Sequence, residues 1–216
     1  ASGGFASSIG EDMGMRRVHS ESLSRTSAIG LICNLARSHG SAERQLRPFS
    51  FARQFYTQMF QEVAEKTGVE LENIVYVKSA AGHYFVMTPT PKSLAENGAV
   101  IDAAHEPLLD RGNVDRARLD AMIRRVLGHA FKAGQPAVLE AVERDARGPA
   151  AWADAGPRLF DFSKMCRSSE GLTFVRPPPG ASVGGSGRDD DDGALLVALT
   201  GDALIEPFWP EGLGIM

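Results

Sequence analysis

Two short β-prone runs separated by only four residues place the strongest constraint on the fold of this 216-residue chain. The runs cover residues 73–78 and 83–88, and the residues between them predict the loop of a hairpin. An apolar stretch at 27–36 is short enough to predict a buried strand. Since helical patterns lie on either side of the hairpin, we predict an α/β fold, in the sense of an α+β mixture.

The flanking helices are predicted from apolar side chains spaced three and four residues apart. Residues 48–66 carry such a stripe, with Ser50 as the expected N-cap and Gly68 as the stop. Because aromatic and methionine side chains at this spacing usually fill a core, we interpret the stripe as packing and not as a cofactor site. The pattern is clearest over 113–132, with Asn113 as the expected N-cap. Shorter helices are expected at 92–97 and 138–144.

Charge and composition exclude several classes of protein. Lys and Arg number 23 against 27 Asp and Glu, so a net charge of −4 gives no global basic field for nucleic acid. No apolar run approaches the roughly 18 residues of a membrane span. Four arginines at 116, 118, 124 and 125 form a local basic cluster, which a solvated helix face explains, although it could also meet an acidic partner.

The cysteines, histidines and aspartates give no sign of a metal site. Two cysteines, Cys33 and Cys166, are too few for a multi-cysteine zinc site, and free thiols in a reducing compartment are favoured over a pair. The five histidines show no zinc-ligand spacing, and His83 is given no role. Residues 177–193 are rich in Pro, Gly and Ser and end in four aspartates that lack the EF-hand spacing. We interpret this segment as a flexible loop and expect no bound metal.

The C-terminal segment carries the motif most closely tied to chemistry. An apolar strand expected at 193–200, buried on both faces if it lies in a parallel sheet, runs into Gly201 and Asp202. Ligands of open α/β sheets lie at the carboxyl ends of strands, where Asp202 could accept hydrogen bonds from cofactor hydroxyls. Gly212 and Gly214 would let the backbone approach a bound ring or phosphate, and Trp209 offers a flat apolar surface.

The whole string GDALIEPFWPEGLG at 201–214 resembles the second FAD fingerprint of the p-hydroxybenzoate-hydroxylase class of flavin monooxygenases. Ile205 stands where many members have His, and the proline lies one position later. Both departures match the MICAL monooxygenases, whose string reads Gly-Asp-x-Leu-x-Glu-Pro-Phe-Trp-Pro. Residues 1–5, 68–76, 83–88 and 160–165 also resemble MICAL segments. The chain departs from the family pattern at 37–47, 98–112 and 177–193, and by one extra residue near Gly82.

This resemblance implies an enzyme that uses FAD, NADPH and O₂ to oxidise a methionine of F-actin. It implies that Asp202 binds the ribityl and phosphate region of FAD and that Tyr84 contacts the flavin. Trp209 would lie beside the isoalloxazine as a catalytic residue, and Pro210, Gly212 and Gly214 would form the flavin-facing turn. A cytoplasmic protein associated with the cytoskeleton is expected.

The resemblance also implies a domain arrangement. Residues 1–36 would be part of a Rossmann-like FAD-binding domain and its connection, and 37–175 a substrate domain with the hairpin and helices. Residues 176–193 would form a flexible loop, after which 194–216 would return to the FAD-binding domain as a truncated segment. The first FAD fingerprint, Gly-x-Gly-x-x-Gly, does not occur in the sequence, the chain does not begin with Met, and it stops where a helix is expected. We therefore expect this chain to be a portion of a longer polypeptide and to contact the remainder of that polypeptide.

Two alternatives to a MICAL-like enzyme remain at this point. One is an aromatic hydroxylase on the same scaffold, which the missing His and the Glu-Pro-Phe-Trp-Pro string disfavour. The other is a non-catalytic MICAL-like module that serves as a structural or interaction unit of a larger, cytoskeletal assembly. Flavin binding by the full-length protein separates the second alternative from an enzyme.

Overall fold

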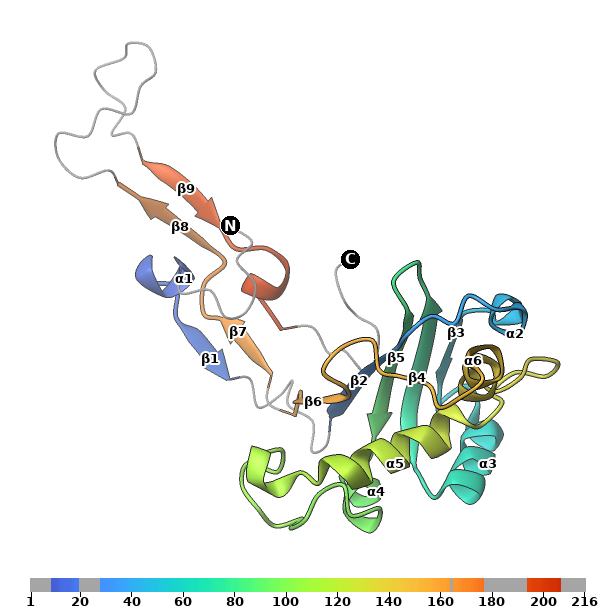
Figure 1. Cartoon of the computed structure of the whole chain (residues 1–216). Helices are drawn as coiled ribbons and strands as arrows, with labels where there is room; N and C mark the ends of the chain where they lie inside the picture. Colours follow the sequence, from blue (N-terminus) through green and yellow to red (C-terminus); the bar gives the residue numbers. More distant parts are fainter. Residues whose placement is uncertain (1–8, 20–27, 164, 177–193, 207–216) are drawn as a thin grey trace. The chain divides into compact units, whose positions relative to one another are not determined.

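The computed structural model describes residues 9–19, 28–163, 165–176 and 194–206 (Figure 1). Contacts divide the chain into two compact units, one of residues 26–163 and one that combines 1–25 with 164–216. The assignment of segments to cofactor and substrate domains stays a prediction. Among the described residues, no helix is long and apolar enough to cross a membrane.

The unit of residues 26–163 is built on a five-stranded antiparallel sheet with strand order β3-β4-β5-β2-β6. Its strands are β2 (Ile29–Leu35), β3 (Phe49–Ala52), β4 (Leu71–Lys78), β5 (His83–Pro89) and β6 (Arg158–Asp161). Its helices are α2 (Ser41–Gln45), α3 (Thr57–Thr67), α4 (Pro91–Glu96), α5 (Arg116–Leu127) and α6 (Val138–Ala146), with a 3₁₀ turn η1 at Arg111–Asn113. The mixed α/β fold class is as predicted.

The predicted hairpin is confirmed as β4 and β5. Lys78 pairs with His83, and the Ser79 amide donates to the Gly82 carbonyl at 2.9 Å. A Cβ on Gly82 would lie 2.9 Å from the Leu35 carbonyl oxygen, closer than a side chain tolerates, so the loop needs glycine where it passes β2.

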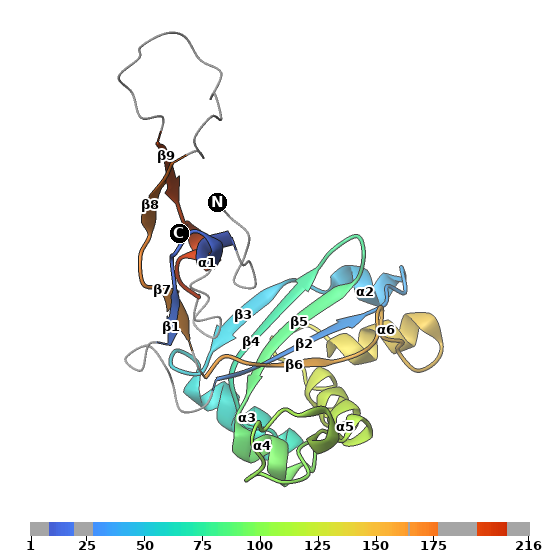
Figure 2. The same ribbon diagram turned by 90° about the vertical axis from the view of Figure 1, so that its left-hand side faces the viewer.

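The core of this unit lies between one face of the sheet and the helices, which gather on the same side of the strands (Figure 2). Alternate strand residues turn toward it, as the pleat requires. The largest of the buried core side chains are Leu31, Leu35, Leu46, Leu71, Ile74, Tyr76, Phe85, Met87, Leu94, Leu119 and Met122. The strand residues between them point to the opposite face, and Ile32, Asn34, Val75, Tyr84 and Val86 are half-buried there.

The predicted helix over 48–66 is wrong in its first half. Residues 49–52 form β3 because Phe49 and Phe51 pair with Tyr76 and Ile74 of β4. The rings of Phe49 and Tyr76, which face each other across the two strands, lie 5.2 Å apart. Ser50 is therefore not an N-cap. The helix begins at Thr57 and ends at Thr67, and the expected stop Gly68 is its C-cap, with a φ of 71° that suits glycine. The segment 37–47, where the sequence departs from the family pattern, contains α2.

The helix predicted over 113–132 exists as α5 but is shorter. Its N-cap is Asp115, whose carboxylate accepts from the amides of Ala117 and Arg118. Asn113 instead lies in η1, where its side chain binds the backbone of Asp102 and Leu108. The helices expected at 92–97 and 138–144 are confirmed as α4 and α6.

In its described residues, the other unit contains two short antiparallel pairs, β1 with β7 and β8 with β9. Its elements are α1 (Ile9–Asp12), β1 (Arg17–His19), β7 (Cys166–Ser168), β8 (Leu172–Val175), β9 (Leu195–Ala198) and the 3₁₀ turn η2 (Gly201–Ala203). The predicted C-terminal strand thus exists, but it is not buried on both faces of a parallel sheet. It pairs antiparallel with β8, and Leu195 and Leu196 are 64% and 53% exposed.

Candidate functional site

Tyr84 lies on β5, the central strand of the sheet, close to the β4–β5 loop and on the face away from the helix-covered core. It stands on β5 directly opposite Asn34 of β2 on one side and Val77 of β4 on the other. Its neighbours in the chain, His83 and Phe85, point into the core and are buried. Burial raises the pKa of the half-buried Tyr84 phenol, and the nearby Cys33 adds to this, so the hydroxyl stays protonated at neutral pH.

Asp202 lies in the other unit, in η2, and is half-buried. Gly201 precedes it with a φ of 58°, a left-handed conformation that suits glycine. The segment that follows is held against β7, because the Ser168 amide donates to the Leu204 carbonyl at 2.7 Å and the Cys166 amide to the Glu206 carboxylate at 2.9 Å. The motif residue Asp202 therefore occupies an anchored turn.

Trp209, Pro210, Gly212 and Gly214 lie outside the described residues, as do residues 1–5 and the four aspartates at 189–192. Tyr84 and Asp202 belong to different units, each of which is described by itself. The roles of these residues toward a flavin thus stay predictions. Cys33 and Cys166 are both free and buried, as the sequence favoured.

A buried polar cluster that sequence reasoning did not find lies behind β5. The side chains of Glu43 and His83 are fully buried, with Glu43 Oε1 3.6 Å from His83 Nε2. On its other side the imidazole Nδ1 is 2.9 Å from the Tyr76 hydroxyl. Glu43 also receives hydrogen bonds from the Arg37 guanidinium and from Ser38 and His39. No sequence signal marks Glu43, because a single acid in a short polar segment resembles any surface helix.

The ionisation of this cluster follows from its surroundings. Burial alone would raise the pKa of Glu43, but the hydrogen bonds from Ser38, Arg37 and His39 outweigh it and bring the pKa to about 2. Burial lowers the pKa of His83 to about 4, although Glu43 opposes the shift. The cluster therefore holds a carboxylate and a neutral imidazole at pH 7.

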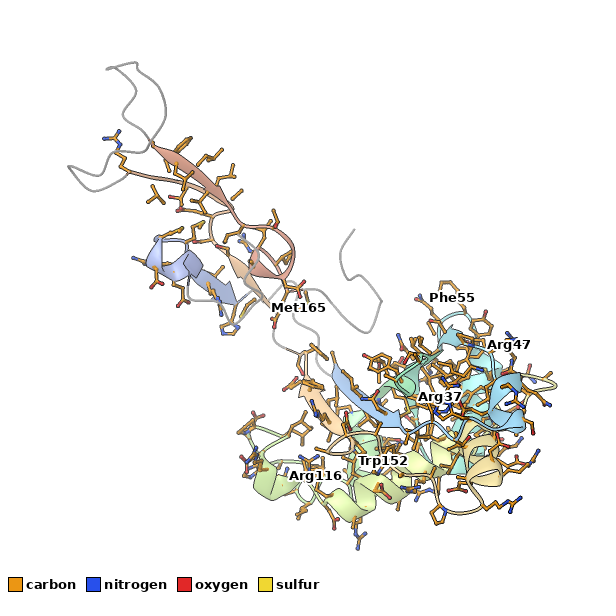
Figure 3. All side chains as sticks on the ribbon, turned by 45° about the horizontal axis from the view of Figure 1, so that its top comes forward. Arg37, Arg47, Phe55, Arg116, Trp152 and Met165 are labelled. Carbon is orange, nitrogen blue, oxygen red and sulfur yellow. The ribbon has the colours of Figure 1, made fainter. Side chains whose placement is uncertain are left out.

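Positive charge gathers near the same end of the sheet. Lys78 donates to the carbonyls of Glu43 and Leu46 at 3.0 Å each, near the end of α2. Burial lowers the pKa of Lys78, and the nearby Arg37 and Arg47, both labelled in Figure 3, lower it further. By contrast, arginines of α5 donate hydrogen bonds to backbone carbonyls within the same unit. Arg124 donates twice to the Ala150 carbonyl, and Arg125 donates to the Thr67 carbonyl.

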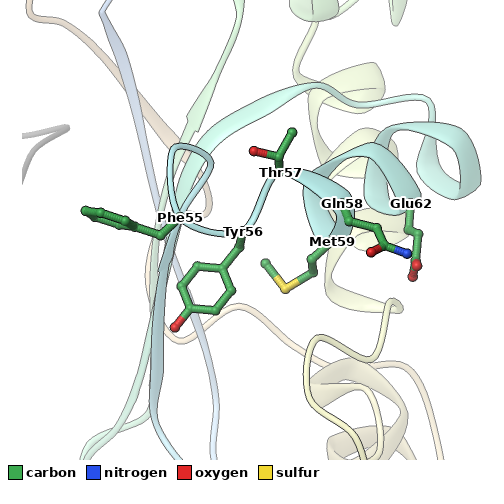
Figure 4. Close-up of a pocket in the computed structure, with 6 residues that line it drawn as sticks. All are labelled: Phe55, Tyr56, Thr57, Gln58, Met59 and Glu62. Atoms are coloured by element: carbon green, nitrogen blue, oxygen red, sulfur yellow. The ribbon is translucent and has the colours of Figure 1, made fainter.

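An open pocket of about 450 Å³ lies where α3 begins, lined by Phe55, Tyr56, Thr57, Gln58, Met59 and Glu62 (Figure 4). Phe55 is 76% exposed, so the pocket is a shallow surface hollow. Among the described residues, no group of three or more His, Cys, Asp or Glu is arranged to hold a metal ion.

Comparison with known proteins gives a consistent picture. A family model described as "Mical, Rossman domain" matches residues 27–146. The chain is 35% identical over 191 residues to the F-actin monooxygenase MICAL3 of Homo sapiens, which is 87% of this chain and 8% of that protein. It is equally similar to the protein-methionine sulfoxide oxidase mical3b of Danio rerio, with 87% and 10% covered. Identity to the F-actin monooxygenase MICAL2 of Rattus norvegicus is 32% over 190 residues, with 87% and 9% covered.

Proposed function

The chain belongs to the MICAL family, and from this premise we propose that it is part of a flavin monooxygenase that oxidises a methionine of F-actin. The observation that carries the proposal is 32–35% identity across 87% of the chain to proteins named as F-actin monooxygenases and methionine sulfoxide oxidases. Because the chain spans only 8–10% of the length of these relatives, the activity is proposed for the protein that contains it.

The proposed reaction balances as methionine, O₂, NADPH and a proton giving methionine sulfoxide, water and NADP⁺. FAD would carry the electrons from NADPH to O₂, which is the chemistry that a flavin supplies when bound. The described residues fit this cofactor in two respects. Tyr84 is a protonated, half-buried aromatic on a sheet face away from the core, and Asp202 offers a carboxylate in an anchored turn.

The direct test is the purified full-length protein. We expect it to absorb in the flavin bands, to consume NADPH, and to convert actin methionine to the sulfoxide, which mass spectrometry of actin peptides detects. A colourless protein that takes up no added FAD would contradict the proposal and support a non-catalytic module. Sulfoxide formation on actin, against hydroxylation of a small aromatic compound, decides between the two enzymatic alternatives.

A substitution tests the proposed role of Trp209. In the flavin-loaded full-length protein, we expect Trp209→Phe to slow NADPH-dependent oxidation by about tenfold, which corresponds to about 1.4 kcal/mol in the barrier, with an unchanged melting temperature. The matched control is Phe55→Leu, which alters an exposed aromatic and should leave turnover unchanged. Unchanged turnover in the Trp209 variant would remove Trp209 from the active site.

A further inference from the structure

Asn34 is an unusual residue for its position. It lies in β2, an interior strand of the sheet, between the buried Cys33 and Leu35. Asparagine is depleted in strands, where β-branched and aromatic side chains pack better, and Ile32, Val75 and Val86 occupy the same face. A residue that departs from a local preference in this way often has a function. The cross-strand neighbour of Asn34 is Tyr84, and directly opposite residues have Cβ atoms about 5 Å apart.

Asp154 fixes the carboxamide of Asn34. The Asn34 Nδ2 donates to Asp154 Oδ2 at 2.8 Å, across 120 residues of sequence. This hydrogen bond lowers the pKa of Asp154 and outweighs burial, which would raise it, and the Gly156 amide and the nearby Arg158 lower the pKa further. An ionised carboxylate can only accept hydrogen bonds, so the amide must turn its NH₂ group toward Asp154 and its Oδ1 the other way.

The segment that carries Asp154 is itself held against β2. The Ala153 amide donates to the Asn34 carbonyl at 3.0 Å, and the Ala36 amide donates to the Ala151 carbonyl at 2.9 Å. The Gly156 amide donates to Asp154 Oδ1 at 3.0 Å, so the carboxylate is anchored at both oxygens. The Asn34 Oδ1 is thus an oriented hydrogen-bond acceptor beside Tyr84. The Asn34–Asp154 hydrogen bond that orients it is exposed to solvent.

We propose that Asn34 is a positioning residue of the site to which Tyr84 belongs, where its Oδ1 accepts an N–H of a bound molecule and Asp154 holds the amide in the required orientation. The inference rests on the proposed monooxygenase function. Two sources can supply the N–H: the flavin ring or a peptide amide of the protein substrate. A purely structural role would explain less, because a hydrogen bond that is exposed to solvent replaces one to water and therefore adds little to stability.

The test uses the full-length flavoprotein with three variants. Asn34→Leu removes the acceptor at similar volume, and Asp154→Leu leaves β2 intact but releases the amide. Asp154→Asn keeps an acceptor for the Asn34 NH₂ group and serves as the conservative rescue. We expect both leucine variants to lower kcat/KM for actin oxidation by about tenfold, the scale of the net contribution of one hydrogen bond, and Asp154→Asn to stay within about threefold of the wild type.

Two readouts identify the source of the N–H. If it belongs to the flavin, the leucine variants shift the flavin absorption bands and reduction potential even without actin. If it belongs to the substrate, KM for actin rises while NADPH consumption without actin is unchanged. Ser50→Val is the matched control, since it alters a polar residue on the same face of the sheet but on β3, three strands away from β2, and should change neither readout.

The inference would be overturned if both leucine variants kept the wild-type spectrum, potential and kcat/KM within twofold, or if Asp154→Asn were as impaired as Asp154→Leu. Should Asn34→Leu fail to fold, the two Asp154 variants decide the question alone, because they act on Asn34 without changing its strand. A wild-type protein without flavin or NADPH consumption refutes the proposed function itself, whereas an active wild type with unaffected variants refutes only the role of Asn34.

Discussion

Among the individual residues, His83 shows best how the surroundings of a side chain decide its chemistry. The sequence places it in a β-prone run and gives it no role, and the pleat then turns it into the core. There it lies between the Tyr76 hydroxyl and the Glu43 carboxylate, fully buried. Because its imidazole is neutral and Glu43 is ionised, the cluster depends on pH in one direction.

We predict that acid destabilises the protein through His83. Its pKa is lowered from 6.5 to about 4, so between pH 6.5 and 4 His83 is protonated in the unfolded chain but neutral in the folded chain. The stabilisation is complete above pH 6.5 and is lost as the pH falls toward 4, by about 3 kcal/mol. Glu43 has the same effect at lower pH. Because its pKa is lowered from 4.5 to about 2, its contribution to stability is lost as the pH falls from 4.5 toward 2. Urea unfolding at pH 7, 5.5 and 4.5 measures the loss.

His83→Gln provides the control for this prediction. The variant should be less stable at pH 7 but should lose less stability between pH 6.5 and 4. A residual slope is expected, because burial also lowers the pKa of His129. An identical slope in the variant and the wild type would contradict the role given to His83.

The residues of the candidate site were predictable only in part. Alternation in the sequence puts Tyr84 on the face opposite Phe85, and the structure bears this out. Neither Asn34 nor Asp154 could be found in this way, since what joins them is a hydrogen bond between residues 120 positions apart. Contacts of that kind depend on which strands become neighbours, and local periodicity carries no such information.

Among the elements, those with strong local signals were predicted best. The hairpin and α5 each combine a clear period with a turn or capping residue, so their existence follows from the sequence. The helix prediction was wrong over residues 48–56 because the sequence fits two periods there. Phe51 and Phe55 are four residues apart, as in a helix, while Phe49 and Phe51 are two apart, as in a strand. Pairing with β4 decided between the two.

The arginines of α5 yield a prediction about this helix. The Arg124 guanidinium donates to Asp120 at 2.8 Å and to the Ala150 carbonyl, and it lies 5.0 Å from the centre of the Trp152 ring. Arg124→Ala should therefore lower the free energy of unfolding by about 2 kcal/mol, from the lost hydrogen bonds and cation–π contact. Arg118, which is 68% exposed on the same helix, is the comparison.

Arg118→Ala should change the free energy of unfolding by no more than about 0.5 kcal/mol, as is usual for exposed positions. Denaturant titration of both variants measures the difference. Equal and small effects would mean that Arg124 is free to bind a partner, as the sequence pattern left open.

At the scale of the whole molecule, the division into two units predicts that residues 26–163 fold alone. The larger buried core lies entirely within this unit, and so do all five strands of its sheet. A polypeptide of residues 26–163 should unfold in one cooperative transition, with a melting temperature within about 4 °C of the main transition of the whole chain. Differential scanning calorimetry tests this, and the absence of a cooperative transition in the isolated unit would contradict it.

The pairing of β2 with β6 bears on how this unit is made. The two strands are neighbours in the sheet, where Ile32 pairs with Arg158, but they lie near opposite ends of the sequence of this unit. The β4–β5 hairpin closes over a four-residue loop, whereas β2 must wait for β6 until nearly the whole unit has been synthesised. Because distant contacts form slowly, one edge of β2 stays open on the ribosome while the hairpin is already in place. We expect a molecular chaperone that binds exposed strand edges to bind the growing chain at the open edge of β2.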